Sequence, residues 1–298
     1  MEAIRQRIQA QIPENIKQLP GTLKPKPPTH LENGAESIPA SLAPTVVSPT
    51  LPTPTVGHEG AVFTIAYATP IAAPPLTVLA TFINPATYPS WNPVTPRVTI
   101  TRPAVSPVPP LLAESSVANS NPAELMLEST HITFEVHMNL DPAKSTTNST
   151  CVITKLEDFN KVTTTSTGEH KGRKGYRVAW KTTGYAPPAF LLRIERVHEF
   201  LESEDGTGTE YRQYETFFGP VAHLMRLTMV SQLETTANAF MDGLKKFVES
   251  GGTVTTTNNE ETAAAAAPAS AAPATTAPAA ATPVAAAPVA AAPATAAA

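Results

Sequence analysis

Hydrophobic positions near the end of the chain repeat at helical spacing. From Gly219 to Gly252, apolar residues recur every three or four positions, and charged or amide residues occupy the opposite side. Pro220 suits the first turn of a helix, and Gly251 suits the left-handed conformation that ends one. The pattern predicts one helix of about 29 residues, roughly 43 Å long. A helix with so apolar a stripe needs a broad surface to cover it.

Between residues 61 and 218, apolar and polar positions alternate with the period of β-strands. Strands are expected at 61–68, 97–101, 131–140, 150–159, 176–182, 191–201 and 209–218, with short helices near 74–83 and 88–93. The alternation slips near Glu195 and Arg196, which predicts a β-bulge there. A long irregular stretch spans residues 102–130. The pattern predicts an α+β domain in which an antiparallel sheet is covered by the C-terminal helix.

Proline and aromatic residues divide the chain into three parts. All ten Phe, both Trp and all six Tyr lie between residues 61 and 250. Residues 1–60 are rich in proline, and residues 253–298 consist mainly of Ala, Pro and Thr. Segments of this composition do not bury enough apolar surface to fold. We therefore predict a folded domain at 61–252 between two disordered segments, 1–60 and 253–298.

Charge and cysteine content exclude several classes of function. The net charge of −4 is dispersed, so no nucleic-acid binding is expected. No apolar run reaches 18 residues, so no membrane span is expected. The single cysteine, Cys151, excludes an intramolecular disulfide and is expected to be a small buried residue. The N-terminus lacks the apolar core of a signal peptide, which favours a reduced, cytoplasmic setting.

The sequence contains none of the short motifs that mark nucleotide, redox, hydrolase or zinc-protease sites. His131, Glu135 and His137 fall on one face of the strand expected at 131–140. The separation of six positions between His131 and His137 corresponds to about 20 Å along a strand, too far for these side chains to share one metal ion. No metal site, catalytic residue or cofactor is therefore expected.

The order of strand, two short helices, six strands and long helix resembles the START-like helix-grip superfamily, also called SRPBCC. This superfamily includes proteins of the polyketide cyclase and coenzyme Q-binding types. The resemblance covers about residues 61–250 and is carried by the segments 71–93, 134–138, 193–200 and 209–221 with the helix that follows. It implies a curved sheet of about seven strands that grips the C-terminal helix around an apolar cavity.

The resemblance favours a non-enzymatic module that binds, and could transport, an apolar small molecule or lipid in this cavity. The expected wall residues are Phe134, Val136, Met138, Trp180, Tyr211, Phe217, Met225 and Thr228. Of these, Tyr211 and Thr228 are expected to orient a polar end of the ligand. Two alternatives stay open. One is an enzyme of the polyketide cyclase or aromatase type that uses Tyr211 or Gln213. The other is an interaction protein whose proline-rich tails bind protein partners, which the sequence does not identify.

Overall fold

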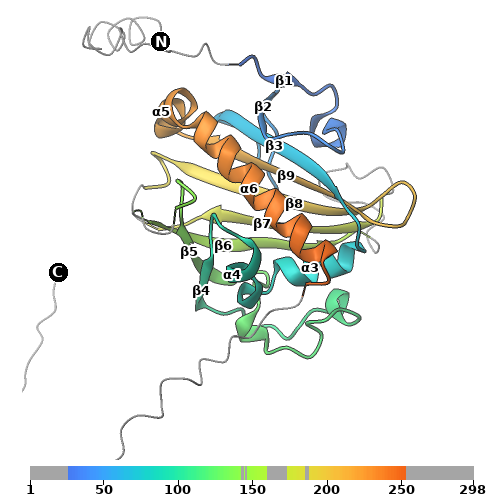
Figure 1. Cartoon of the computed structure of the whole chain (residues 1–298). Coiled ribbons are helices and arrows are strands. Elements are labelled where there is room, and N and C mark those ends of the chain that lie inside the picture. Colours follow the sequence, from blue (N-terminus) through green and yellow to red (C-terminus); the bar gives the residue numbers. More distant parts are fainter. Residues whose placement is uncertain (1–25, 142–143, 145, 160–172, 185–187, 253–298) are drawn as a thin grey trace, which may run out of the picture. The chain divides into compact units, whose positions relative to one another are not determined.

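A computed structural model describes residues 26–141, 144, 146–159, 173–184 and 188–252. In this part of the chain, nine strands form one curved sheet in the order β1-β2-β3-β9-β8-β7-β6-β5-β4. The C-terminal helix α6 crosses one face of the sheet (Figure 1). The predicted fold class is confirmed, with nine strands in place of about seven. The segments 1–25 and 253–298, which were expected to be disordered, lie outside the described residues.

The strands all pair antiparallel with their neighbours except β1, which pairs parallel with β2. The strands are β1 (Thr29–His30), β2 (Thr45–Ser48), β3 (Ala61–Ile71), β4 (Arg97–Arg102), β5 (His131–Val136), β6 (Thr147–Asp158), β7 (Gly175–Thr182), β8 (Arg193–Glu202) and β9 (Thr209–Phe218). The helices are α3 (Pro75–Phe82), α4 (Tyr88–Trp91), α5 (Pro220–Thr228) and α6 (Val230–Glu249).

The expected long helix is divided in two at Met229. This residue has φ −120° and ψ −7°, so it leaves the helical conformation and changes the direction of the chain. The start of α5 is held by a hydrogen bond from the Val221 amide to the Leu191 carbonyl, 3.0 Å long. Among the described residues, no helix combines the length and the apolar character that a membrane crossing requires.

Helix α6 packs against the concave face of the sheet and against α4. Its apolar stripe, including Phe240, Leu244 and Val248, is buried as the sequence pattern predicted. Gly243 lies directly on the backbone of Trp91, where an added Cβ would be 2.0 Å from the carbonyl oxygen. Any other residue at position 243 would push α6 away from α4. The helix ends before Gly251, which has φ 91°, the left-handed conformation expected there.

The stretch 102–130 contains two short 3₁₀ helices and little other regular structure. It nevertheless contributes Leu112, Val117 and Met126 to the main core. The Met126 amide also donates a 2.9 Å hydrogen bond to the carbonyl of Ile83, at the end of α3. This long connection is therefore packed against the short helices rather than looped into solvent.

Strand β8 is regular where a bulge was expected, so that prediction is wrong. Its register with β7 and β9 is continuous through Glu195 and Arg196. These two charged residues face opposite sides of the sheet, Arg196 on the concave side and Glu195 on the convex side. The apparent slip in the alternation arises because a charged residue is enclosed on each face.

The second correction concerns residues 26–60, which were expected to be a disordered linker. They form β1, β2 and a layer over the convex face of the sheet. Leu31, Ile38, Val47 and Leu51 pack there against Ala66, Ala68, Ala179, Val197 and Tyr214. The small alanine side chains let this layer approach the sheet closely. The strands beneath it are consequently buried on both faces, and every residue of β9 is buried.

The carboxylate of Glu195 ties this layer to the sheet. Glu195 is fully buried, and its oxygens accept hydrogen bonds from the backbone amides of Thr55 (3.1 Å) and Val56 (2.9 Å). They also accept from the hydroxyls of Thr55 (2.7 Å) and Thr154 (3.0 Å). Several hydrogen bonds of this kind can hold a buried charge without a cation beside it. The backbone N–H groups of Thr55 and Val56 thus attach the proline-rich segment to the sheet.

We predict that a chain starting at residue 61 is much less stable than one starting at residue 26. Fully burying a large apolar side chain contributes about 1.5–3 kcal/mol, and the N-terminal layer buries four against the sheet. We expect the shorter chain to lose at least about 5 kcal/mol in urea unfolding, or not to fold. Equal urea midpoints for the two chains would show that residues 61–252 fold without the layer.

Candidate functional site

A cavity of about 280 Å³ lies between the concave face of the sheet and the helices α5 and α6. Protein interiors are otherwise packed with few voids larger than a water molecule, so a space of this size is unusual. Strands β5 to β9 supply most of the wall, and α5 and α6 supply the rest. The lining is largely apolar and includes Phe134, Trp180, Ile194, Phe217, Met225, Met229 and Leu233.

Six of the eight residues expected in the wall are brought together here. They are Phe134, Val136, Met138, Trp180, Phe217 and Met225. Their strand positions follow from the alternation of β5, β7 and β9, which turns every second side chain to the concave face. Met138 follows the last residue of β5 by two positions and still reaches the cavity.

The other two expected residues lie elsewhere. Tyr211 is fully buried in the core, and its hydroxyl lies 2.7 Å from Nδ1 of His198. Thr228 is exposed near the end of α5 and donates a 2.9 Å hydrogen bond to the carbonyl of Leu224. Thr228 therefore lies on the solvent side of α5. Neither side chain is positioned to orient a molecule in the cavity.

One end of the cavity is open to solvent. Met138, Met225 and Met229 are only partly buried, and Thr147 is exposed. Methionine side chains are unbranched and adapt readily to the shape of a neighbouring molecule. The mouth between α5, α6 and the ends of β5 and β6 is therefore bordered by the most adaptable apolar residues of the wall.

A charged pair stands at the inner end of the cavity. Nη2 of Arg196 on β8 donates to both carboxylate oxygens of Glu215 on β9, at 2.9 Å each. Burial disfavours the charged form of Arg196, but the Glu215 carboxylate outweighs it and raises the pKa of the guanidinium. The pair is therefore an ion pair at neutral pH. Sequence reasoning missed it, although two charges in a row within an apolar strand were a visible signal.

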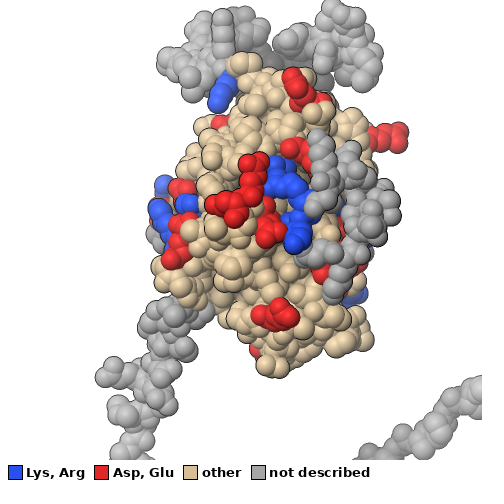
Figure 2. Space-filling view, turned by 90° about the vertical axis from the view of Figure 1, so that its right-hand side faces the viewer, with Lys and Arg blue, Asp and Glu red and all other residues tan. Residues whose placement is uncertain are grey.

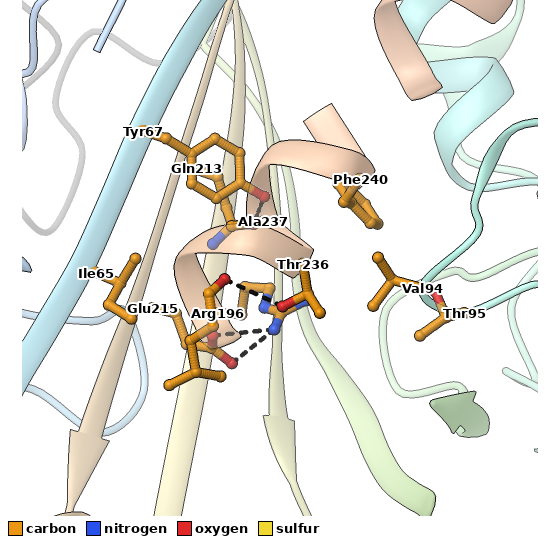
Figure 3. Close-up of a pocket in the computed structure, with 11 residues that line it drawn as sticks. Ile65, Tyr67, Val94, Thr95, Arg196, Gln213, Glu215, Thr236, Ala237 and Phe240 are labelled. Atoms are coloured by element: carbon orange, nitrogen blue, oxygen red, sulfur yellow. Dashed lines mark hydrogen bonds and ion pairs between the residues drawn. The ribbon is translucent and has the colours of Figure 1, made fainter. Parts of the chain in front are cut away.

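Behind this pair is a second hollow of about 30 Å³, which fits one or two water molecules (Figure 3). Tyr67 and Gln213 border it, and the Tyr67 hydroxyl donates to Oε1 of Gln213. Burial raises the pKa of Tyr67, so this hydroxyl stays protonated. Thr236 and Ala237 of α6 face the hollow from the opposite side (Figure 3).

His198 and Tyr211 form a third polar pair, enclosed by aromatic rings. The ring centroids of Trp180 and Phe82 lie 4.4 Å and 4.5 Å from that of His198. Burial, with a smaller contribution from the Arg196 charge, holds the pKa of His198 well below its usual range. The imidazole is therefore neutral at pH 7. Neither His198 nor Tyr211 lines the cavity or the hollow behind it.

Cys151 lines the cavity and is buried, as expected from its strand context. Burial raises the pKa of its thiol to about 12, which keeps it in the less reactive protonated form. His137 is buried rather than on a wet strand face, and its Nε2 lies 3.1 Å from Glu135. In the described part of the chain, no group of three or more His, Cys, Asp or Glu residues could hold a metal ion.

Charges on the outside of the molecule are mixed in sign. Figure 2 shows acidic and basic side chains lying next to one another on one face. At the surface, Arg97 contacts Glu135 at 3.3 Å, and Lys245 contacts Glu249 at 3.0 Å. Such neighbouring opposite charges cancel at a distance, so they do not build an extended field of one sign.

No family model matches the sequence. A curated protein of Penicillium oxalicum, named oxopyrrolidines biosynthesis cluster protein O, is 28% identical over 208 residues. The alignment covers 67% of this chain and 93% of that protein.

Among solved structures, the di-domain ARO/CYC BexL from the BE-7585A biosynthetic pathway is similar at 13% identity and a TM-score of 0.40. That match covers 62% of this chain and 46% of BexL. Hypothetical protein jhp0584 of Helicobacter pylori is 10% identical, with 62% of this chain and 85% of that chain covered and a TM-score of 0.39. A norcoclaurine synthase of Thalictrum flavum is 10% identical, with 64% and 96% covered and a TM-score of 0.37.

These likenesses are partial, and the fold assignment rests on the chain's own topology. A strand is followed by two short helices, six antiparallel strands and a C-terminal helix that lies in the curve of the sheet. The chain therefore has the helix-grip architecture that its sequence predicted, a curved antiparallel sheet around a C-terminal helix.

Proposed function

We propose that this protein binds a small molecule with a largely apolar body in the cavity beneath α5 and α6. The cavity itself is the observation that carries the proposal: about 280 Å³ of space is walled mainly by apolar side chains. Sites for small molecules are concave, mostly apolar and equipped with a few polar groups. An apolar void without an occupant costs stability, because its lining loses contacts that close packing would supply.

The arrangement of the wall supports binding rather than incomplete packing. Rigid aromatic rings of Phe134 and Trp180 form the inner wall, with centroids 5.3 Å apart. The partly exposed methionines border the mouth. A rigid inner wall combined with an adaptable entrance would let a molecule enter and leave without unfolding the sheet.

The curated relative supports a biosynthetic small molecule as the occupant. Its name assigns that Penicillium protein to a gene cluster for oxopyrrolidine biosynthesis. At 28% identity, the likeness does not transfer the compound itself. We therefore propose a small product or intermediate of biosynthesis, which includes lipids, as the class of ligand.

A cyclase would need an acid or base that reaches its substrate. His198 and Tyr211 are neutral groups suited to proton transfer, but both lie outside the cavity. Glu215 does line the cavity, but its carboxylate is held by Arg196. This arrangement favours binding over catalysis. Residues 26–60 pack on the sheet, so the alternative role for the tails now concerns residues 1–25 and 253–298, which lie outside those described, and it stays a prediction.

Filling the cavity from α5 tests the proposal. In a solid interior, Met225→Trp would be overpacked and would cost about 1–3 kcal/mol. In the cavity, the indole has space, so we expect an unchanged or raised melting temperature. We also expect the affinity for the neutral fluorescent probe N-phenyl-1-naphthylamine to fall about tenfold or more, since the indole takes its place.

Leu227→Trp is the matched control, because Leu227 lies on the same helix with 78% of its surface exposed. It should leave both the melting temperature and probe affinity unchanged. A wild-type protein that takes up no probe, together with a lower melting temperature for Met225→Trp, would mean that the interior is effectively solid and would refute the proposal.

The position of His198 in the core predicts a pH-dependent stability. An unfolded histidine has a pKa of about 6.5, whereas the folded His198 has a much lower one. Below about pH 6.5, only the unfolded chain takes up this proton, so stability falls as the pH falls. The slope from His198 approaches about 1.4 kcal/mol per pH unit. We expect His198→Asn to remove this contribution in urea unfolding between pH 7 and pH 5.

His223→Asn serves as the control, since His223 is exposed on α5. His131, whose pKa is also lowered by burial, is present in both variants and cancels from the comparison. If the free energy of unfolding changed with pH equally in His198→Asn and in the wild type, His198 would be titrating in contact with water. It would then be available for acid–base chemistry.

A further inference from the structure

Arg196 and Glu215 form an ion pair at a position where apolar side chains would avoid the cost of burying charge. Removing two charges from water is costly, and replacing a buried pair by apolar residues is often neutral or stabilising. Both residues line the cavity, and 29% of the Arg196 side chain is accessible, compared with 11% of the Glu215 side chain. The pair is thus a charged end wall in an otherwise apolar cavity.

Arg196 has more hydrogen-bond donors than partners. A guanidinium carries five N–H groups, and only those on Nη2 are used, both by Glu215. Nε is enclosed and has no hydrogen-bond partner among the described residues. Buried donors are nearly always paired in folded proteins, so the enclosed Nε–H points to an acceptor supplied from outside the chain.

Acceptors stand beside these donors. Each Glu215 oxygen accepts one hydrogen bond from Arg196 and keeps further accepting capacity. Thr236 faces the pair from α6. Its hydroxyl donates its hydrogen to the carbonyls of Gln232 and Leu233, each at 3.0 Å. Towards the cavity, Thr236 can therefore only accept. The end wall offers donors from β8 and acceptors from β9 and α6.

The charges decide what kind of group fits. Arg196 and Glu215 together carry no net charge, so neither an anion nor a cation gains from the pair as a whole. A carboxylate close to Arg196 would also lie close to Glu215, and an ammonium near Glu215 would lie close to Arg196. A neutral group with a carbonyl oxygen and a neighbouring N–H or O–H satisfies both sides.

We propose that Arg196, Glu215 and Thr236 select ligands with a neutral head of this kind, such as an amide, a lactam or the enol of a 1,3-dicarbonyl. The inference rests on the proposed function and adds the chemistry of the ligand's polar end. The carbonyl oxygen accepts from Arg196, the N–H or O–H donates to Glu215 or Thr236, and the apolar body lies towards the methionine-lined mouth.

Four compounds with the same ten-carbon chain test the head group by displacement of N-phenyl-1-naphthylamine. Decanamide has both the acceptor and the donor, and N,N-dimethyldecanamide keeps only the acceptor. Decanoate is an anion, and decyltrimethylammonium is a cation with no donor. Hydrogen bonds to charged groups are among the strong ones, so we expect decanamide to bind about tenfold or more tightly than each of the other three.

The double variant Arg196→Met with Glu215→Leu removes the pair without leaving one charge unpartnered. We expect its affinity for decanamide to fall about ten- to hundredfold, and the advantage of decanamide over N,N-dimethyldecanamide to disappear. Arg193→Met is the matched control, because Arg193 lies on the same strand and does not line the cavity. This control variant should keep the wild-type order of affinities for the four compounds.

The order of affinities of the wild-type protein for the four compounds tests the inference even if the double variant does not fold. Equal displacement by all four compounds would overturn the inference and leave the binding cavity standing. Tightest binding of decanoate would overturn it in favour of an anionic ligand. Failure of N-phenyl-1-naphthylamine to bind at all, together with a lower melting temperature for Met225→Trp, would instead remove the proposed function, and the inference with it.

Discussion

The middle of the sheet is covered on both faces, and the other features of the molecule depend on this constraint. Helix α6 lies over the concave face, and the N-terminal layer packs on the convex face of β8 and β9. A strand between two covers has little contact with water, so its polar side chains depend mainly on partners inside the protein. Glu195 finds backbone amides of the N-terminal layer, and Arg196 finds Glu215.

The two faces satisfy their charges differently. On the convex side, Arg177 bridges the carboxylates of Glu157 and Glu199 and so joins three adjacent strands. On the concave side, Arg196 has one carboxylate and an accessible surface that borders a cavity. The convex network strengthens contacts within the sheet. A buried pair with unused donors adds little to stability, so its position at the end of a cavity favours a role in recognition.

The positions of β3 to β9 and of the C-terminal helix could be predicted from the periodic spacing of their apolar and polar residues. The N-terminal layer could not, because its apolar residues follow no helical or strand period and pack only through tertiary contacts. Six wall residues followed from strand alternation. Glu195 and Arg196 were interpreted as a bulge, since consecutive charges and an extra residue disturb the alternation in the same way.

The break at Met229 links the helix to the cavity. In one continuous helix, the stripe containing Met225 and Met229 would run straight along the sheet, and α5 would continue the packing of α6. Instead the chain leaves the helical conformation at Met229, both methionines border the cavity, and Leu224 and Leu227 on α5 are exposed. Periodicity predicts which residues share a helical face, but it does not detect one non-helical residue within the stripe. The space under α5 therefore depends on a backbone conformation that the sequence pattern does not indicate.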